Sequence, residues 1–194
     1  MLFAKKQFEI PYLSRFVFIF SYGFLVSFFS MVFGEKLGLF VEGVPGNIVG
    51  LSFVAGMIMG WFLEKLWLRM EGINRELMTA LVLFLFTAFL SIVGLAVGAT
   101  LAGNGVLVFE WAGLDGYESA GLVFGCVSAF LGLWIATRAL LPTSSKMPWM
   151  IFANGVLMLL LLFLGDRLQN PNLVSLSVLA MPALTLILRY GFKF

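Results

Sequence analysis

The feature that most constrains this chain is the spacing of its charged side chains. Between Arg15 and Glu35 there is no Asp, Glu, Lys or Arg, and five further uncharged windows of at least similar length follow. An α-helix rises 1.5 Å per residue, so about 20 residues cross the roughly 30 Å hydrocarbon core of a bilayer. The windows predict membrane-spanning helices at approximately residues 16–34, 44–63, 77–100, 119–137, 147–165 and 173–189.

The composition agrees with this pattern. Hydrophobic residues make up 61% of the 194-residue chain and charged residues 11%, with a mean hydropathy of +1.05. Ordinary soluble domains have about 25% charged residues. We therefore expect an all-α integral membrane protein, a single polytopic domain over residues 1–194 with about six transmembrane helices. A net charge of +2 gives no reason to expect nucleic acid as a partner.

The histidine and cysteine content limits the reactions and metal sites that this chain can support. The chain has no histidine, which removes the commonest general base and the usual ligand of haem and transition metals. Its one cysteine, Cys126, lies inside an apolar run and has no second cysteine with which to form a disulfide. No catalytic set, cofactor motif or metal cluster is recognisable, so the sequence argues against an enzyme and predicts no cofactor.

The basic residues predict an orientation. With the N-terminus in the cytoplasm, ten of the twelve Lys and Arg residues lie inside, and only Lys36 and Arg167 lie outside. Cytoplasmic loops carry an excess of Lys and Arg, so we expect both termini to be cytoplasmic. The same bias, without any organelle signal, favours a bacterial inner membrane.

Small residues recur at helical spacing in three of the predicted helices. They are Gly46, Gly50, Gly56 and Gly60 in the second, Thr87, Ser91, Gly94, Gly98 and Ala102 in the third, and Gly121, Gly125, Ser128 and Gly132 in the fourth. In lipid, helices associate through close van der Waals contact, which small residues permit. These stripes are interpreted as packing faces within one chain, as an interface between copies in a homo-oligomer, or as the wall of a solute path.

The segment "EKLWLRMEGINRE" at 64–76 is the largest polar feature predicted on the cytoplasmic side. Its basic residues Lys65, Arg69 and Arg75 are the best candidates for docking a cytoplasmic partner; the alternative is a loop that is only solvated. Glu64 and Lys65 come closest to the bilayer interior, and we expect an interfacial ion pair whose side chains reach the water.

Two further polar features remain. Asn154 lies in the middle of a predicted span, where an amide needs an interhelical partner or serves as a ligand contact. Glu110, Asp115 and Glu118 gather in one loop predicted to lie outside, where they could bind a cation or a protein. Their spacing resembles no calcium-binding loop, so a solvated acidic loop is the alternative.

These observations favour a non-enzymatic subunit that scaffolds or senses within a larger membrane assembly and docks a cytoplasmic partner. The expected partners are the bilayer, a second copy of the chain and a cytoplasmic protein. The alternative is a carrier, or a substrate-binding subunit of a transporter, for a small and largely apolar solute. In size and number of spans alone, the chain resembles the substrate-binding subunits of vitamin transporters.

Overall fold

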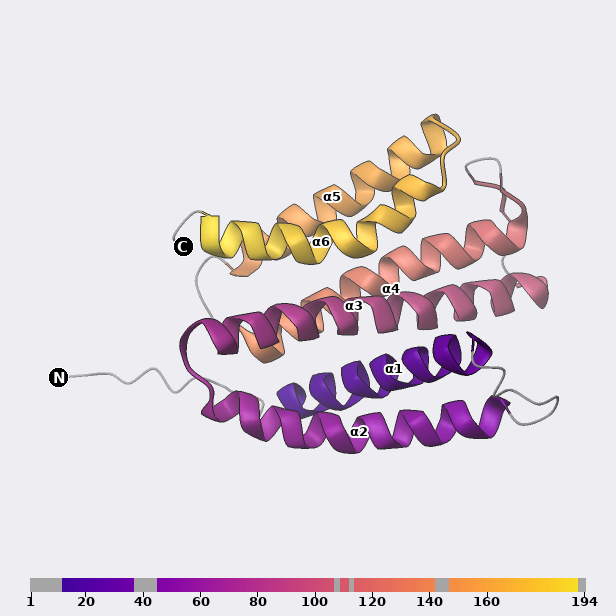
Figure 1. The fold of residues 1–194 in the computed structure, drawn as a ribbon. Helices are drawn as coiled ribbons and strands as arrows, with labels where there is room; N and C mark the ends of the chain where they lie inside the picture. Colours follow the sequence, from indigo (N-terminus) through magenta and orange to yellow (C-terminus); the bar gives the residue numbers. More distant parts are fainter. Residues whose placement is uncertain (1–11, 37–44, 107–108, 112–113, 142–146, 192–194) are drawn as a thin grey trace.

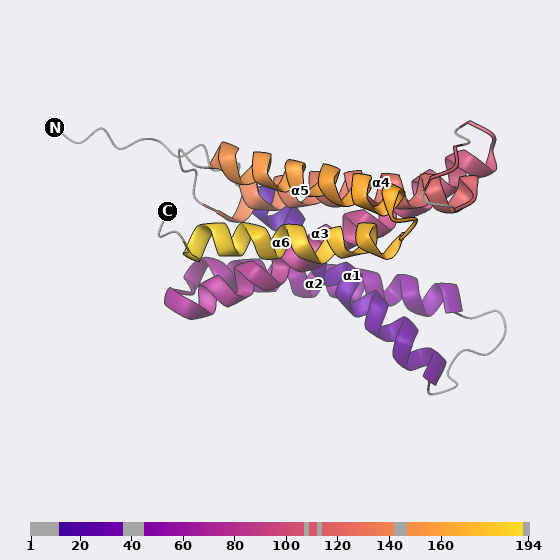
Figure 2. The same cartoon turned by 90° about the horizontal axis from the view of Figure 1, so that it is seen from above.

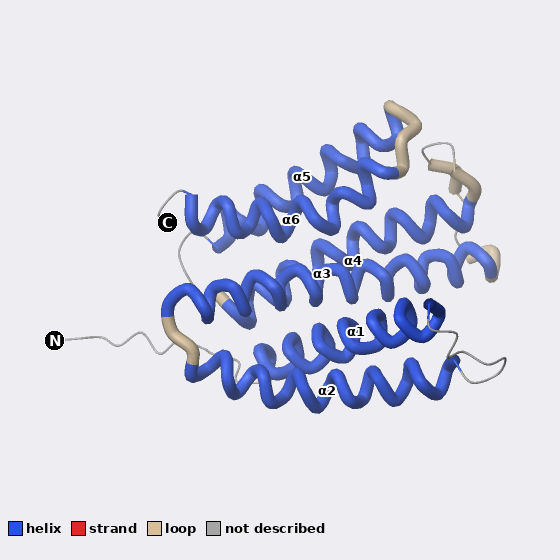
Figure 3. Tube along the Cα trace, in the orientation of Figure 1, coloured by secondary structure: helices blue, strands red, loops and turns tan. Residues whose placement is uncertain are grey.

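A computed structural model of the chain describes residues 12–36, 45–106, 109–111, 114–141 and 147–191. These residues form six helices (Figure 1), namely α1 (Leu13–Lys36), α2 (Pro45–Arg69), α3 (Gly72–Gly103), α4 (Gly116–Leu140), α5 (Met147–Arg167) and α6 (Asn172–Gly191). The described residues contain no β-strand, only an isolated bridge between Trp111 and Leu114 (Figure 3). The predicted all-α bundle of about six helices is confirmed.

Five helices, α1 to α5, contain a stretch long and apolar enough to cross a membrane. In α6 the described apolar stretch is shorter, Ser175–Tyr190, and Pro182 lies inside it. Most helices extend beyond the predicted membrane spans. For example, α2 ends at Arg69, whereas the predicted span ends at residue 63. Charged residues end the uncharged windows but not the helices, because a helix continues into the headgroup region without penalty. The chain is an integral membrane protein by this architecture.

The six helices form three antiparallel pairs. The α3–α4 pair is central, α1 packs against both of its helices, and α2 packs mainly on α1. The α5–α6 pair covers another side, where α6 contacts α3 and α4 and α5 contacts α4 (Figure 2). The largest buried side chains, Phe18, Leu83, Phe86 and Met181, come from α1, α3 and α6, so the core lies where these helices meet α4.

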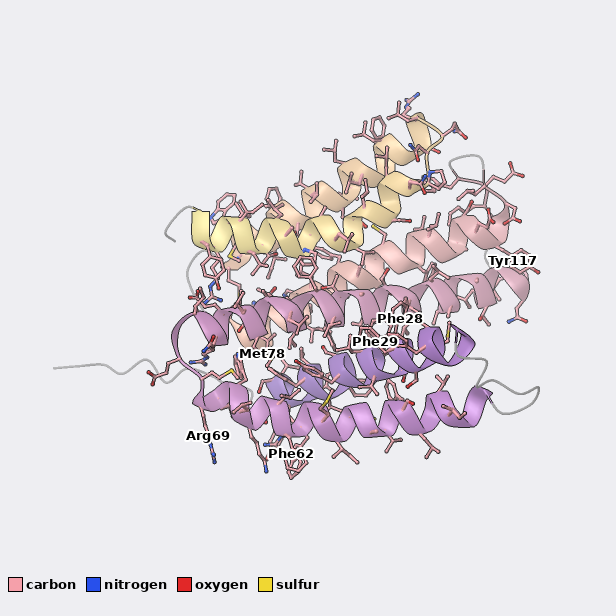
Figure 4. The ribbon with its side chains drawn as sticks, in the orientation of Figure 1. Phe28, Phe29, Phe62, Arg69, Met78 and Tyr117 are labelled. Carbon is pink, nitrogen blue, oxygen red and sulfur yellow. The ribbon has the colours of Figure 1, made fainter. Side chains whose placement is uncertain are left out.

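Large apolar side chains cover the outside of the bundle. On α2 they include Leu51, Ile58 and Phe62, which are 71%, 55% and 58% exposed, and α1 and α5 present similar faces. Phe62 points away from the other helices in Figure 4. A soluble monomer rarely exposes so much apolar surface, whereas lipid covers it at no cost.

The two ends of the bundle differ in charge. One end holds the start of α1, the end of α6 and the α2–α3 connection, and we call it the basic end (Figure 1). Its described basic residues are Arg15, Lys65, Arg69, Arg75, Arg138 and Arg189. The opposite, acidic end holds Glu110, Asp115, Glu118 and Asp166, together with Arg167 and the last residue of α1, Lys36.

Candidate functional site

The α3–α4 contact is built around two glycines of α3. A Cβ atom at Gly94 would overlap the Phe124 carbonyl oxygen and Ser128 of α4, and one at Gly98 would overlap the Ala120 carbonyl, with the Ala120 carbonyl carbon at 2.7 Å. Both glycines are buried. Only hydrogen in place of a side chain permits this approach of two helix backbones.

The same device joins α1 and α2. A Cβ atom at Gly56 would overlap the Tyr22 carbonyl of α1, and one at Gly60 would lie 2.5 Å from the Phe18 carbonyl oxygen. Gly50, in contrast, has no neighbouring atom within 4 Å. Gly46 lies in the first turn of α2, and its surroundings are outside the described part of the chain. The close glycine contacts of α2 are therefore with a helix of the same chain.

The glycines of α4 are packed less closely than its sequence pattern indicates. Cβ atoms at Gly121, Gly125 and Gly132 would lie 3.4, 3.2 and 3.1 Å from the nearest atoms of α3. The closest backbone approach is made instead by the α3 glycines, which face the carbonyl groups of Ala120 and Phe124 in α4. Gly125 also borders an open groove, described below.

The connection between α2 and α3 is a short corner stabilised by contacts among Trp67, Arg75 and Thr79, which we call the Trp67–Thr79 clasp. Trp67 is 4% exposed, and its indole Nε1–H donates to Thr79 Oγ1 at 3.0 Å. The Thr79 hydroxyl donates to the Arg75 carbonyl at 2.7 Å, and the Arg75 guanidinium lies 4.7 Å from the Trp67 ring centre. Gly72 begins α3 with φ +58°, in the left-handed region that favours glycine. The corner is thus ordered by contacts on both helices.

The outer side of this corner combines charge with exposed apolar side chains. We define the corner surface as Leu68, Arg69, Ile73, Arg75 and Leu77, all exposed, with Ile73 at 71% and Leu77 at 63%. Arg69 projects away from the bundle in Figure 4. Of the three basic residues predicted to dock a partner, Arg69 and Arg75 belong to this surface. Lys65 lies one turn earlier, with its Nζ 3.6 Å from the Trp61 ring centre.

The position of Glu64 differs from the water-exposed ion pair with Lys65 that the sequence predicted. It does not reach the water beside Lys65, because its side chain is 2% exposed and faces α1. Ser14 Oγ donates to Glu64 Oε1 at 3.1 Å, and Arg15 Nε lies 3.5 Å from Glu64 Oε2. A buried carboxylate needs such partners. The sequence offered no sign of them, since they lie about 50 residues away in the chain.

Two of the three acidic residues predicted in the outer loop, Asp115 and Glu118, lie at the start of α4. Asp115 Oδ1 accepts the backbone N–H groups of Tyr117 at 3.1 Å and Glu118 at 3.0 Å, which is the role of an N-cap. Glu118 lies in the first helical turn, where a negative charge is favourable, and Glu110 is exposed. Tyr117, at this end of the bundle, is labelled in Figure 4. Asp115 therefore has a structural role in addition to any binding role.

Asn154 is 1% exposed and has an interhelical partner. Its Nδ2 donates to Thr185 Oγ1 of α6 and to the Met150 carbonyl of its own helix, both at 2.8 Å. Its Oδ1 is buried without a hydrogen-bond partner among the described residues. Asn154, Thr185 and Thr137 of α4 line a cavity of about 10 Å³, the space of roughly one water molecule.

A larger hollow lies at the outer side of α3, α4 and α6. This groove has a volume of about 280 Å³ and is open on one side. Its polar wall groups are Ser91, Cys126 and Ser175. Cys126 Sγ lies 3.2 Å from Ser177 Oγ, a contact between α4 and α6 that could not be predicted from the sequence. The groove is slightly smaller than typical pockets for drug-sized ligands.

Within the described residues, no group of three or more Cys, Asp or Glu side chains is placed to hold a metal ion. No protein-family model matches the chain, and neither a curated protein nor a solved structure shows significant similarity to it.

Proposed function

We propose that this protein is a non-enzymatic subunit of a membrane assembly that docks a cytoplasmic protein through the corner surface at its basic end. The observation that carries the proposal is the exposure of Ile73 and Leu77 beside Arg69 and Arg75 on a corner that the Trp67–Thr79 clasp holds in place. An ordered surface needs no folding on binding, so less free energy is lost when a partner docks.

The length of α3 supports the proposal that the corner surface lies outside the hydrocarbon core of the bilayer. The helix has 32 residues, which is about 48 Å at 1.5 Å per residue, against a core of roughly 30 Å. Its first turns carry Arg75 and Glu76, so these turns lie in the headgroup region or the water. Exposed Ile and Leu in that position favour a protein contact, with positive charge suited to an acidic partner.

We further propose that the basic end faces the cytoplasm, because cytoplasmic loops carry an excess of Lys and Arg, and that the membrane is a bacterial inner membrane. A second copy of the chain is a further proposed partner. The close glycine contacts of α2 and α3 are already made within the chain, so the oligomer would use other faces.

A photo-crosslinking amino acid tests the docking surface. Placed at Ile73 in the full-length protein, in the cells that produce it, the probe is expected to give one protein adduct of defined mass. The same probe at Leu160, an exposed position on the apolar face of α5, is the control and is expected to give lipid adducts only. Charge reversal of Arg69 and Arg75 is expected to remove the Ile73 adduct.

Two results would contradict the proposal. One is a probe at Ile73 that reacts only with lipid, as it does at Leu160. The other is an Ile73 adduct that persists in the charge-reversed protein while the orientation in the membrane is unchanged. Orientation must be measured in the same variant, because the substitutions also weaken the positive-inside signal.

A further inference from the structure

The side-chain amide of Asn154 has one hydrogen-bonding group left unpaired. Asn154 is 1% exposed, and its Nδ2 donates to the Met150 carbonyl and to Thr185 Oγ1, each at 2.8 Å. A carbonyl oxygen can only accept a hydrogen bond, so the contact with Met150 fixes which end of the amide carries the nitrogen. The other end, Asn154 Oδ1, is buried without a hydrogen-bond partner among the described residues.

The described side chains around the small cavity do not supply the missing donor. The Thr185 hydroxyl has a single proton, which it donates to the Met181 carbonyl at 3.1 Å. The other side-chain donors in the cavity wall are Thr137 and Trp134 of α4, and neither forms a hydrogen bond with Asn154 Oδ1. A buried acceptor without a donor destabilises the folded state, so this oxygen gains from a molecule that brings its own O–H.

The cavity that Asn154 lines has the size and the polar lining of a site for one water molecule. Its volume is about 10 Å³, and one water needs roughly 10–15 Å³ measured in this way. A buried water forms two to four hydrogen bonds, and the wall offers the Asn154 amide and the hydroxyls of Thr137 and Thr185. Thr137 is 2% exposed, and no hydrogen bond within the described part of the chain occupies its hydroxyl.

The absence of charge in this wall favours water over a metal ion. The wall residues that the structure describes include no Asp or Glu. A cation inside the membrane without a negative partner is costly. Water is neutral, and it can donate the hydrogen bond that Asn154 Oδ1 lacks.

We propose that one ordered water molecule is bound in this cavity and joins α5 to α4. The water donates a hydrogen bond to Asn154 Oδ1 and accepts one from the Thr137 hydroxyl. Because Asn154 also bonds Thr185 of α6, the bridge gives three helices one shared polar contact inside the membrane. The site is separate from the corner surface, so its occupancy does not depend on partner docking.

Thermal unfolding of the full-length protein in detergent tests the bridge. Thr137→Val removes the hydroxyl and nearly keeps the shape of the side chain, and it is expected to lower the unfolding midpoint by about 2–4 °C. In an Asn154→Leu protein the same substitution is expected to cause no loss, because that protein already lacks the acceptor of the bridge. The control is Thr87→Val on α3, since the Thr87 hydroxyl donates to the Leu83 carbonyl of its own helix at 2.7 Å and Thr87 does not line the cavity. Its effect is expected to be the same in both backgrounds.

Two measurements on the wild type test the site even where a variant fails to fold. An experimental structure that resolves ordered water is expected to show one molecule within about 3.2 Å of Asn154 Oδ1. Replacement of sodium by choline in the buffer is expected to leave the unfolding midpoint unchanged, because the occupant is neutral.

Three results would overturn the proposal. The first is a dry cavity in a structure that resolves ordered water elsewhere. The second is an unfolding midpoint that rises with sodium but not with choline, which indicates that the occupant is a cation. The third is a Thr137→Val substitution that lowers the midpoint equally with and without Asn154→Leu, which shows that no molecule couples the two side chains.

Discussion

α4 has α3 on one side and α6 on another, and the two contacts are built differently. Against α3, backbone meets backbone at Gly94 and Gly98, with no space for one more carbon atom. Against α6, side chains meet through the Cys126–Ser177 pair, and the contact is bordered by the open groove beside α3 and the small cavity beside α5. In lipid, an added side chain that separates the helices removes more van der Waals contact from the closely packed α3–α4 pair than from the α4–α6 pair. The difference indicates a fixed α3–α4 pair and an α4–α6 contact that tolerates substitutions.

The largest expected effect comes from breaking the α3–α4 contact. Gly98→Leu places a side chain where the Ala120 carbonyl of α4 lies, and we expect a loss of about 3 kcal/mol of stability or failure to fold. The matched control is Gly50→Leu on α2, which meets no atom within 4 Å and is expected to keep the stability or to raise it by up to about 1 kcal/mol, because leucine favours a helix more than glycine does. Thermal unfolding in detergent measures both. Equal losses for the two variants would show that the backbone contact has no special weight.

A smaller effect is expected where the α5–α6 pair is held together by a hydrogen bond. Asn154→Leu removes the 2.8 Å contact with Thr185 Oγ1, and interhelical hydrogen bonds of this kind contribute about 0.6 to 2 kcal/mol in membranes. A double-mutant cycle with Thr185→Val isolates the pair, and we expect a coupling of about 0.6 kcal/mol. Strictly additive effects would mean that the two side chains do not interact.

The smallest effect is expected at Gly125, which lies between the two regions. Its added Cβ atom would lie 3.2 Å from the Ser91 carbonyl oxygen on one side, while the other side borders the groove. Alanine improves helix propensity by about 1 kcal/mol over glycine, which offsets the mild crowding. Gly125→Ala is therefore expected to unfold within a few degrees of the wild type. A loss as large as that expected of Gly98→Leu would place Gly125 in the fixed contact and not at its edge.

The helices were predictable from the sequence because their signal is local. Uncharged windows of helical length identify all six, including α6, and the buried positions of α3 include Thr87, Ser91, Gly94, Gly98 and Ala102, which share one face by spacing alone. These properties depend on helix geometry and on the bilayer, and not on which helix lies next to which.

The site was less predictable because its contacts join distant parts of the chain. Lys65 is the neighbour of Glu64 in sequence, yet the carboxylate faces Ser14 and Arg15 of α1. Thr185 is the partner of Asn154, but nothing in α6 alone distinguishes it from a hydroxyl bonded to its own helix. Likewise, a glycine stripe does not reveal which of two facing helices contributes the closest approach.

The pairing of Glu64 with α1 has a consequence for biosynthesis. α2 leaves the ribosome carrying a carboxylate whose partners among the described residues, Ser14 and Arg15, lie on the preceding helix, and an unpaired charge is expensive in lipid. We therefore expect the insertion machinery to retain α1 until α2 arrives, so that the two helices enter the bilayer together as a hairpin. Gly56 and Gly60 then let them close on each other before α3 is synthesised.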